Sequence, residues 1–179
     1  MKNKQEIVEN WLPRYTGQNL KDFGEYILLC NFDNYVTKFA EIPIATPEYE
    51  DALQLRKAVL RTPLGLSFSL DDLTGEASCA HLGGYDEEGR LVAILLLKPL
   101  DERTVKMRQV AVRPGLQGRG IGAQLVAFAE AFARARGCQT MIAHARATAV
   151  NFYRRLGYAT SGEPFIETTI PHLLVTKDL

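Results

Sequence analysis

The sequence predicts a mixed α/β (α+β) fold, in which a central, mostly antiparallel sheet is flanked by helices. Between residues 77 and 112, two short polar turns separate three β-rich runs, which is typical of an antiparallel meander. From residue 121 onward, helical periodicity alternates with short apolar runs, so a strand–helix–strand unit follows the meander. Together these two patterns predict one mixed sheet with helices on its faces.

Residues 1–40 differ from the rest and predict a small N-terminal helical extension. They are rich in aromatic residues, and Ile7, Trp11 and Leu12 have the spacing of one helical face. Residues 26–39 suggest a second, less regular helix. We therefore divide the 179 residues into an extension, 1–40, and one domain, 41–179.

The first part of the domain predicts a strand, a helix and the three strands of the meander. Residues 41–45 are a short apolar strand candidate. A helix should begin at Thr46-Pro47-Glu48, because threonine caps a helix, proline fits its first turn and acids favour its positive end. Pro63 and Gly65 should end it, and residues 67–76 read as a loop. The meander strands are expected over 77–85, 90–97 and 103–112.

The second part of the domain predicts two helices and two further strands. The helix from Ile121 to Arg136 has its apolar residues at steps of four, three and four, namely Ile121, Leu125, Phe128 and Phe132. Gly137 provides its C-terminal stop. The remaining elements are expected as a strand over 140–143, a helix over 147–156 and a last strand over 170–176.

Composition excludes several functional classes. The formal net charge is zero, which argues against a broad basic surface for nucleic acid. The charged N-terminus does not resemble a signal peptide, and the longest apolar run, 91–97, is too short to span a bilayer. Three widely separated cysteines, Cys30, Cys79 and Cys138, have no zinc-ligand spacing and suggest buried free thiols. We expect a cytoplasmic protein with no metal and no membrane partner.

A glycine-rich turn, Gln117-Gly118-Arg119-Gly120-Ile121-Gly122, joins the third meander strand to the helix from Ile121. Such a turn presents unpaired N–H groups at the positive end of a helix, where a phosphate binds well. The missing Cβ atoms let the backbone approach a pyrophosphate closely. The spacing fits neither the dinucleotide fingerprint nor a P-loop, so a purely structural turn remains the alternative.

In this context the sequence resembles the GNAT superfamily of N-acetyltransferases over residues 41–179. Residues 110–114 with the glycine turn are similar to the family's strand and Q/R-x-x-G-x-G/A motif, and residues 151–158 to its F-Y-x-x-x-G-F/Y signature. Residues 55–56, 60–65 and 170–172 resemble one bacterial subgroup. Residues 10–17 faintly resemble the N-terminus of bacterial AMP nucleosidases, whose catalytic domain is absent from this chain.

The resemblance implies a GNAT-like fold and acetyl-CoA (CoA) as co-substrate. In the family the strand backbone, here Val110, Ala111 and Val112, pairs with the pantetheine arm, and the N–H of Val112 lies near the thioester oxygen. The pyrophosphate would bind the loop residues Gln117, Gly118, Arg119, Gly120, Ile121 and Gly122. Arg119 as a solvated side chain, and Val110 and Val112 as core residues, are the alternatives.

The resemblance also assigns residues around the thioester. Tyr153 matches the family's general acid, with packing between helix and sheet as the alternative. Asn151 would contact the CoA arm or cap the chain locally. Arg146 occupies a position where the family often has asparagine, so it either takes another role, such as a phosphate contact, or the contact is lost.

The general base is the least determined residue. Many relatives place a glutamate on the strand before the turn, whereas this chain has Met107-Arg108-Gln109. His144 and His172 are the first candidates, because histidine has a suitable unperturbed pKa. The other acids and bases weighed are His81, Glu76 and Glu163. A water chain without a dedicated base is equally open.

We therefore expect an acetyl-CoA-dependent N-acetyltransferase acting on a primary amine, either a small molecule or a peptide. The alternative is a catalytically inactive CoA-binding sensor or partner-binding module. A nucleotide-binding oxidoreductase is disfavoured, because an antiparallel meander precedes the glycine turn. The family resemblance also suggests a homodimer.

Overall fold

The computed structural model describes residue 36 and residues 38–69 and 73–179. The first half contains β1 (Lys38–Glu41), α3 (Pro47–Arg56), the π-helix η1 (Lys57–Arg61), the 3-10 turn η2 (Thr62–Leu64), β2 (Ala80–Tyr85), β3 (Leu91–Pro99) and β4 (Thr104–Val112). The second half contains α5 (Ile121–Ala135), β5 (Thr140–Arg146), η3 (Ala147–Ala149), α6 (Val150–Arg155), β6 (Ala159–Glu167) and β7 (Ile170–Asp178).

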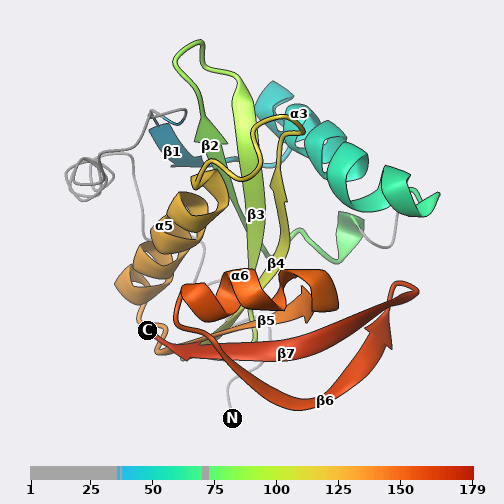
Figure 1. The fold of residues 1–179 in the computed structure, drawn as a ribbon. Helices are drawn as coiled ribbons and strands as arrows, with labels where there is room; N and C mark the ends of the chain where they lie inside the picture. Colours follow the sequence, from blue (N-terminus) through green and yellow to red (C-terminus); the bar gives the residue numbers. More distant parts are fainter. Residues whose placement is uncertain (1–35, 37, 70–72) are drawn as a thin grey trace.

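The described strands form one seven-stranded sheet in the order β1-β2-β3-β4-β5-β7-β6. Only the β4–β5 pairing is parallel, and the other five are antiparallel. The predicted mixed, mostly antiparallel sheet is thus confirmed. In Figure 1 strands β1–β4 stand upright while β5–β7 run across the lower part of the molecule, so the sheet turns strongly between β4 and β5.

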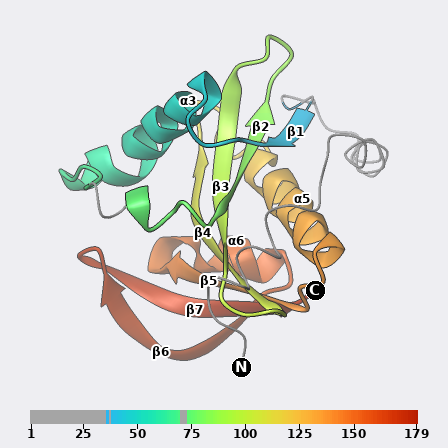
Figure 2. The same ribbon diagram turned by 180° about the vertical axis from the view of Figure 1, so that it is seen from behind.

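Helices cover both faces of the sheet (Figures 1 and 2). On one face α5 and α6 enclose the larger core, which includes Leu125, Phe128 and Phe132. On the other face α3 packs Tyr49, Ala52 and Leu55 against the sheet. Strand β3 is buried on both sides from residue 91 to 97, which explains its unbroken apolar run. No helix within the described ranges is long and apolar enough to cross a membrane.

Helix α5 follows the predicted pattern. Its apolar stripe, with Ile121 and Leu125 at the N-terminal end, is buried. The helix stops where Gly137 adopts a positive φ of 84°, a conformation that favours glycine at a helix end. After it, β5 alternates strictly, so Met141, Ala143 and Ala145 enter the core and His144 and Arg146 face the other side.

The N-terminal boundary differs from the prediction. The first strand is β1 at Lys38–Glu41 and not residues 41–45, because β1 pairs with β2 from Lys38↔Tyr85 to Glu41↔Leu82. The predicted helix over 26–39 is therefore wrong at residues 38–39. The rest of that segment, and the helical face of Ile7, Trp11 and Leu12, lie outside the described residues.

Strand β6, at Ala159–Glu167, was not predicted from the sequence. It is an edge strand with mostly exposed side chains, and it contains Gly162 and Pro164. It therefore lacks both the alternating pattern and the β-branched composition that identify a strand.

The helix from Pro47 also departs from a simple α-helix, since it widens into the π-helix η1 after Arg56.

The cysteines that the structure describes, Cys79 and Cys138, are buried free thiols as predicted. Cys30 lies outside the described residues.

Candidate active site

A cavity of about 310 Å³ lies where β4 and β5 separate. The two parallel strands pair from Thr104↔Thr140 to Met107↔Ala143 and no further. Beyond that point the cavity is lined by residues from β4, β5, η1, the η3–α6 segment and the β6–β7 hairpin. Helix η1 and the tip of this hairpin lie on the same side of the molecule in Figures 1 and 2. The cavity is therefore enclosed by segments far apart in sequence.

A β-bulge at Gln109 accompanies the separation of the strands. Gln109 has a positive φ of 52°, and the β3–β4 register shifts between Ile94 and Leu96, so two β4 residues face Leu95. A bulge of this kind bends its strand and sharpens its twist. The bend comes just after the last β4–β5 pair.

A buried ion pair holds the bulge in place. The Arg56 Nη2 atom lies 2.6 Å from Glu76 Oε2, and both side chains are at most 1% exposed. Arg56 Nε also donates to Gln109 Oε1 at 2.7 Å, and Gln109 Nε2 donates to the second Glu76 oxygen. Glu76, weighed as a base from the sequence, is thus occupied by two partners and does not line the cavity.

His144 projects from β5 into the cavity beside an unforeseen acid. Its Nδ1 atom contacts Glu167 Oε2 at the end of β6. The Lys106 ammonium lies 3.0 Å from His144 Nδ1 and 3.1 Å from Nε2. Burial raises the pKa of Glu167, but the hydrogen bond from His144 and the neighbouring charges outweigh it and lower that pKa. Burial, reinforced by Arg108 and Lys98 against the opposing effect of Glu167, lowers the pKa of Lys106.

His172 lines the same cavity from β7. It is 7% exposed, and its Nδ1 atom lies 2.9 Å from the carbonyl oxygen of Ile170. The ring of Phe165 separates the two histidines, with centroids 4.7 Å from His144 and 6.1 Å from His172. Both predicted histidines therefore contact the same ring, and His144 also contacts the carboxylate of Glu167.

Tyr153 reaches the cavity from α6. Its ring is 7% exposed and packs edge-on against Phe152 and Tyr158, with centroids 5.0 and 5.6 Å away. Burial raises the pKa of Tyr153 to about 12, so the hydroxyl is protonated throughout the physiological range. No residue in the described part of the chain forms a hydrogen bond with this hydroxyl, which leaves it available to a ligand.

The glycine turn lies beyond the C-terminal end of β4, outside the cavity. Gly118 and Gly120 have positive φ values of 79° and 81°, which favour glycine. Gly120 caps α5 without a side-chain hydrogen bond. Among the residues that the structure describes, none accepts a hydrogen bond from the N–H groups of Gly118, Gly120 or Gly122. This helix start therefore fits an anionic group such as a pyrophosphate.

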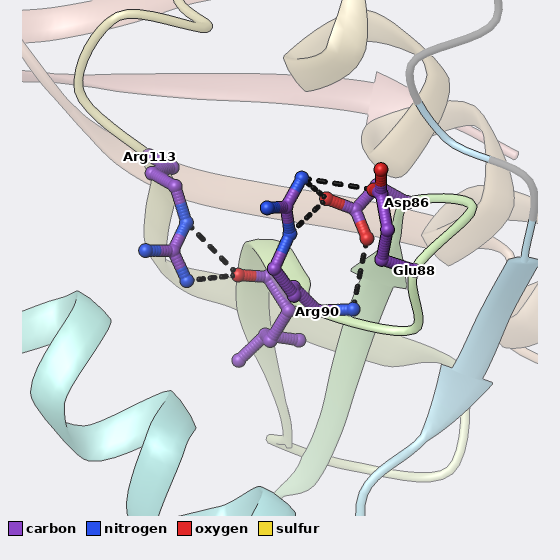
Figure 3. Close-up of polar contacts among 5 residues, drawn as sticks. Asp86, Glu88, Arg90 and Arg113 are labelled. Carbon is purple, nitrogen blue, oxygen red and sulfur yellow. Dashed lines mark hydrogen bonds and ion pairs between the residues drawn. The ribbon is translucent and has the colours of Figure 1, made fainter.

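The end of β4 is fixed between the cavity and the glycine turn (Figure 3). Arg113 donates its backbone N–H to Val92 O at 2.8 Å and its guanidinium to Leu91 O at 2.7 and 3.3 Å. Arg90 meanwhile pairs with Asp86 and Glu88 in the β2–β3 turn.

Because N–H groups alternate along a strand, Val112 turns its N–H to the side where β5 no longer pairs. Gln117 Nε2 donates to Val112 O at 3.1 Å.

The structure divides the predicted site residues into two groups. Val110, His144, Arg146, Tyr153 and His172 line the cavity. The six residues of the glycine turn do not line it, and Ala111 and Val112 connect the cavity and the turn along β4. Asn151 is exposed on α6 and stays a prediction.

Two of the weighed bases lie elsewhere, and several cavity residues were missed. His81 is buried against Tyr49, and Glu163 is exposed on β6. Lys106, Glu167 and Arg61 were not foreseen. Alternation along β4 places Lys106 on the face opposite the buried Val105 and Met107, so the sequence could have shown which face of the sheet Lys106 occupies. Glu167 lies on β6, a strand that the sequence did not predict. Within the described ranges, no group of three His, Cys, Asp or Glu side chains could hold a metal ion.

Comparisons with known proteins agree on one family. The sequence profile of the Acetyltransferase (GNAT) family matches residues 44–158. The uncharacterised protein YyaT of Bacillus subtilis is 30% identical over 142 residues, which cover 74% of this chain and 90% of that protein. A crystallised Lactobacillus plantarum protein has 28% identity and a TM-score of 0.70, with 79% of this chain and 98% of that chain covered. A GNAT family acetyltransferase from Elizabethkingia anophelis, crystallised with acetyl-CoA bound, has 17% identity, a TM-score of 0.62 and coverages of 79% and 97%.

Proposed function

The chain belongs to the GNAT acetyltransferase family, and we propose that it transfers the acetyl group of acetyl-CoA to a primary amine. The observation that carries this proposal is the cavity between β4 and β5. There the protonated Tyr153 hydroxyl and the His144–Glu167 pair line one space, at the strand edge that leads to an open helix N-terminus.

Acetyl-CoA would bind along β4. The free N–H groups at the start of α5 would receive the pyrophosphate, and the β4 edge at Val110–Val112 would pair with the pantetheine arm. The Elizabethkingia protein, of the same fold, holds acetyl-CoA. This path would bring the thioester along β4 to the cavity, where the N–H of Val112, on the strand edge that β5 leaves unpaired, would lie near its carbonyl oxygen.

The chemistry requires a base, donors to the oxyanion and an acid. We assign the base to His144. Glu167 accepts from Nδ1, and Nε2 would take the amine proton, directly or through water, in place of its contact with the Lys106 ammonium. The amine nitrogen then bonds to the carbonyl carbon, and the carbon–sulfur bond breaks. Tyr153 gives its proton to the departing thiolate, and its raised pKa of about 12 keeps the hydroxyl protonated until then.

The first test is thermal unfolding with and without acetyl-CoA. A ligand at about 100 times its Kd should stabilise the fold by about 2.7 kcal/mol, which raises Tm by a few degrees for a chain of this size. CoA should shift the transition, and NAD should not. No shift at saturating acetyl-CoA would contradict the proposal.

The second test measures free thiol release over a panel of primary amines. Turnover that depends on both acetyl-CoA and amine supports the enzyme. Acetyl-CoA binding without thiol release from any amine would favour a CoA-binding module instead.

A further inference from the structure

The candidate cavity is strongly cationic. Among its lining residues are four permanently or usually positive side chains, Arg61, Lys106, Arg108 and Arg146, against a single carboxylate, Glu167. Glu167 is already engaged by His144. A cavity with this balance attracts anions and repels a second cation.

Arg146 lies where two elements meet at the cavity wall. It projects from the end of β5, and its Nη2 atom donates to the carbonyl of Leu60 on η1 at 3.0 Å. That carbonyl immediately precedes Arg61, so the two arginines come together across the gap between β5 and η1. Arg61 itself stacks on Phe68, with 4.9 Å between the guanidinium carbon and the ring centroid.

Within the described part of the chain, neither Arg146 nor Arg108 forms an ion pair with a carboxylate. Burial and the nearby charge of Arg61 lower the pKa of Arg146, the direction expected for a guanidinium without an acidic neighbour. A half-buried arginine in this setting gains most from an anion that accepts two hydrogen bonds.

On the premise of the proposed function, we propose that the acceptor is a small amine that also carries a carboxylate or another acidic group. Its anionic end binds Arg146 and Arg61, and its amine faces His144 and Glu167. The cavity volume of about 310 Å³ suits a small molecule. The four cations disfavour polyamines.

These arginines are separate from the expected phosphate site of acetyl-CoA. That site is the turn at residues 117–122, and none of its residues lines the cavity. The two roles can therefore be separated by experiment, because an acceptor contact changes the KM of the amine and a phosphate contact changes the binding of acetyl-CoA.

The test uses matched pairs of amines at saturating acetyl-CoA, with thiol release as the readout. In two kinds of pair the acid is an L-amino acid or an ω-amino acid, and the neutral partner is its amide. In a third pair the acid is 2-aminoethylphosphonate, and ethanolamine is the partner without the acidic group. We expect the acid of the preferred pair to exceed its neutral partner in kcat/KM by about 10- to 100-fold, the range of one charge-assisted contact. The phosphonate arm distinguishes a carboxylate requirement from a general requirement for an anion.

Variants locate the effect. Arg146→Gln and Arg61→Gln should raise the KM for the acid by about 10- to 100-fold, remove the preference over the amide, and leave the Kd of acetyl-CoA within about twofold. Arg103→Gln is the matched control, since Arg103 is exposed and outside the cavity, and it should change nothing.

Two results would overturn the inference while leaving the acetyltransferase intact. One is turnover of neutral amines or amides at least as fast as of acids. The other is a loss of acetyl-CoA binding in Arg146→Gln with an unchanged preference between acid and amide. If acetyl-CoA neither binds nor turns over with any amine, the proposed function itself fails and this inference fails with it.

Discussion

His81 shows how burial removes a titratable side chain from the candidate bases. The ring is 1% exposed, and its Nδ1 atom has no hydrogen-bond partner in the described part of the chain. Burial lowers the pKa of His81 to about 4, with a smaller contribution from Arg56 and an opposing one from the carbonyl of Glu76. The histidine is thus neutral and structural at neutral pH.

This burial predicts an acid-sensitive fold. The unfolded chain binds a proton at His81 below about pH 6.5 and the folded chain only below about pH 4, so unfolding is favoured as the pH falls through this window. A shift from 6.5 to about 4 corresponds to about 3 kcal/mol of unfolding free energy. We expect His81→Leu to reduce the loss of stability between pH 7 and pH 4.5, measured by urea unfolding.

Cys79→Ala is the control for His81. Cys79 is buried in the same apolar cluster as Tyr49, the neighbour of His81, and its substitution keeps the histidine, so this variant should lose stability at both pH values alike. An unchanged pH dependence in His81→Leu would show that other groups cause the acid sensitivity.

Tyr153 leads to a prediction about catalysis. Tyr153→Phe should lower kcat by about 10²- to 10⁴-fold, the usual contribution of a general acid, while acetyl-CoA still raises Tm. Because the pKa of Tyr153 is raised to about 12, the hydroxyl stays protonated as the pH rises and should cause no loss of rate below that value. Steady-state kinetics from pH 6 to 10 check both points.

The matched control is Tyr158→Phe. Tyr158 packs against Tyr153, but its hydroxyl donates to Met141 Sδ inside the core and does not line the cavity. Its loss should affect stability more than turnover. A Tyr153→Phe enzyme with an unaltered kcat would assign this residue to packing.

At the scale of secondary-structure elements, the bulge in β4 depends on contacts with other segments. Arg56 comes from α3, Glu76 from the loop before β2, and Gln109 from β4 itself. Removing one member of a buried ion pair leaves an uncompensated charge, so this network is expected to be sensitive to substitution. The open strand edge for the pantetheine arm thus depends on an interaction between segments distant in sequence.

The β6–β7 turn stores backbone strain beside the cavity. Glu167 pairs with Ile170, and both residues between them, Thr168 and Thr169, have positive φ values of 50° and 67°. A two-residue turn of this kind favours Asn-Gly, and β-branched residues fit it poorly. The structure thus holds Glu167 next to a strained hairpin tip.

We predict that Thr168→Asn with Thr169→Gly raises the free energy of unfolding by about 1 to 2 kcal/mol, because each residue relieves a strained conformation. Chemical denaturation measures this change. Thr169→Val is the control, because it keeps the β-branched side chain at positive φ and should give no gain. Equal stability of the Asn-Gly variant and the parent would mean that the turn is not strained.

For the molecule as a whole, the described core includes residues before position 40. Val36 is 2% exposed and Phe39 is 9% exposed, and Phe39 stacks on Phe128 of α5 with ring centroids 5.3 Å apart. Strand β1 completes the sheet edge beside β2. The core therefore includes residues on the N-terminal side of the predicted division at residue 40, and that division stays a prediction.

A pair of truncations tests the limit. A chain starting at Val36 should keep its acetyl-CoA-dependent rise in Tm, because it retains every described core residue. A chain starting at Ile42 should lose about 3 kcal/mol or more, since Val36 and Phe39 no longer fill the core. Phe39→Ala in the full chain provides the comparison, with an expected loss of about 3 to 5 kcal/mol. If the chain that starts at Val36 fails to fold, residues 1–35 belong to the domain.

The sequence by itself determined the meander, helix α5 and the glycine turn, because each depends on neighbours along the chain. Periodicity of two or 3.6 residues, and glycine before a helix, are local signals that report which face is buried. They predicted the fold class. The resemblance to the GNAT family, together with the chemistry of histidine, singled out Tyr153, His144, His172 and Arg146, which the structure brings to one cavity.

Only the tertiary structure decided the partners within that cavity. Glu167 comes from an exposed edge strand, and the sequence of that strand does not show which of its side chains point to which face of the sheet. Glu167 contacts His144, which lies 23 residues earlier in the chain. Arg61 and Arg146 meet only because η1 packs against the end of β5. Such contacts follow from strand order and from the direction of the sheet, which are set by packing of the whole core and leave no local pattern in the sequence.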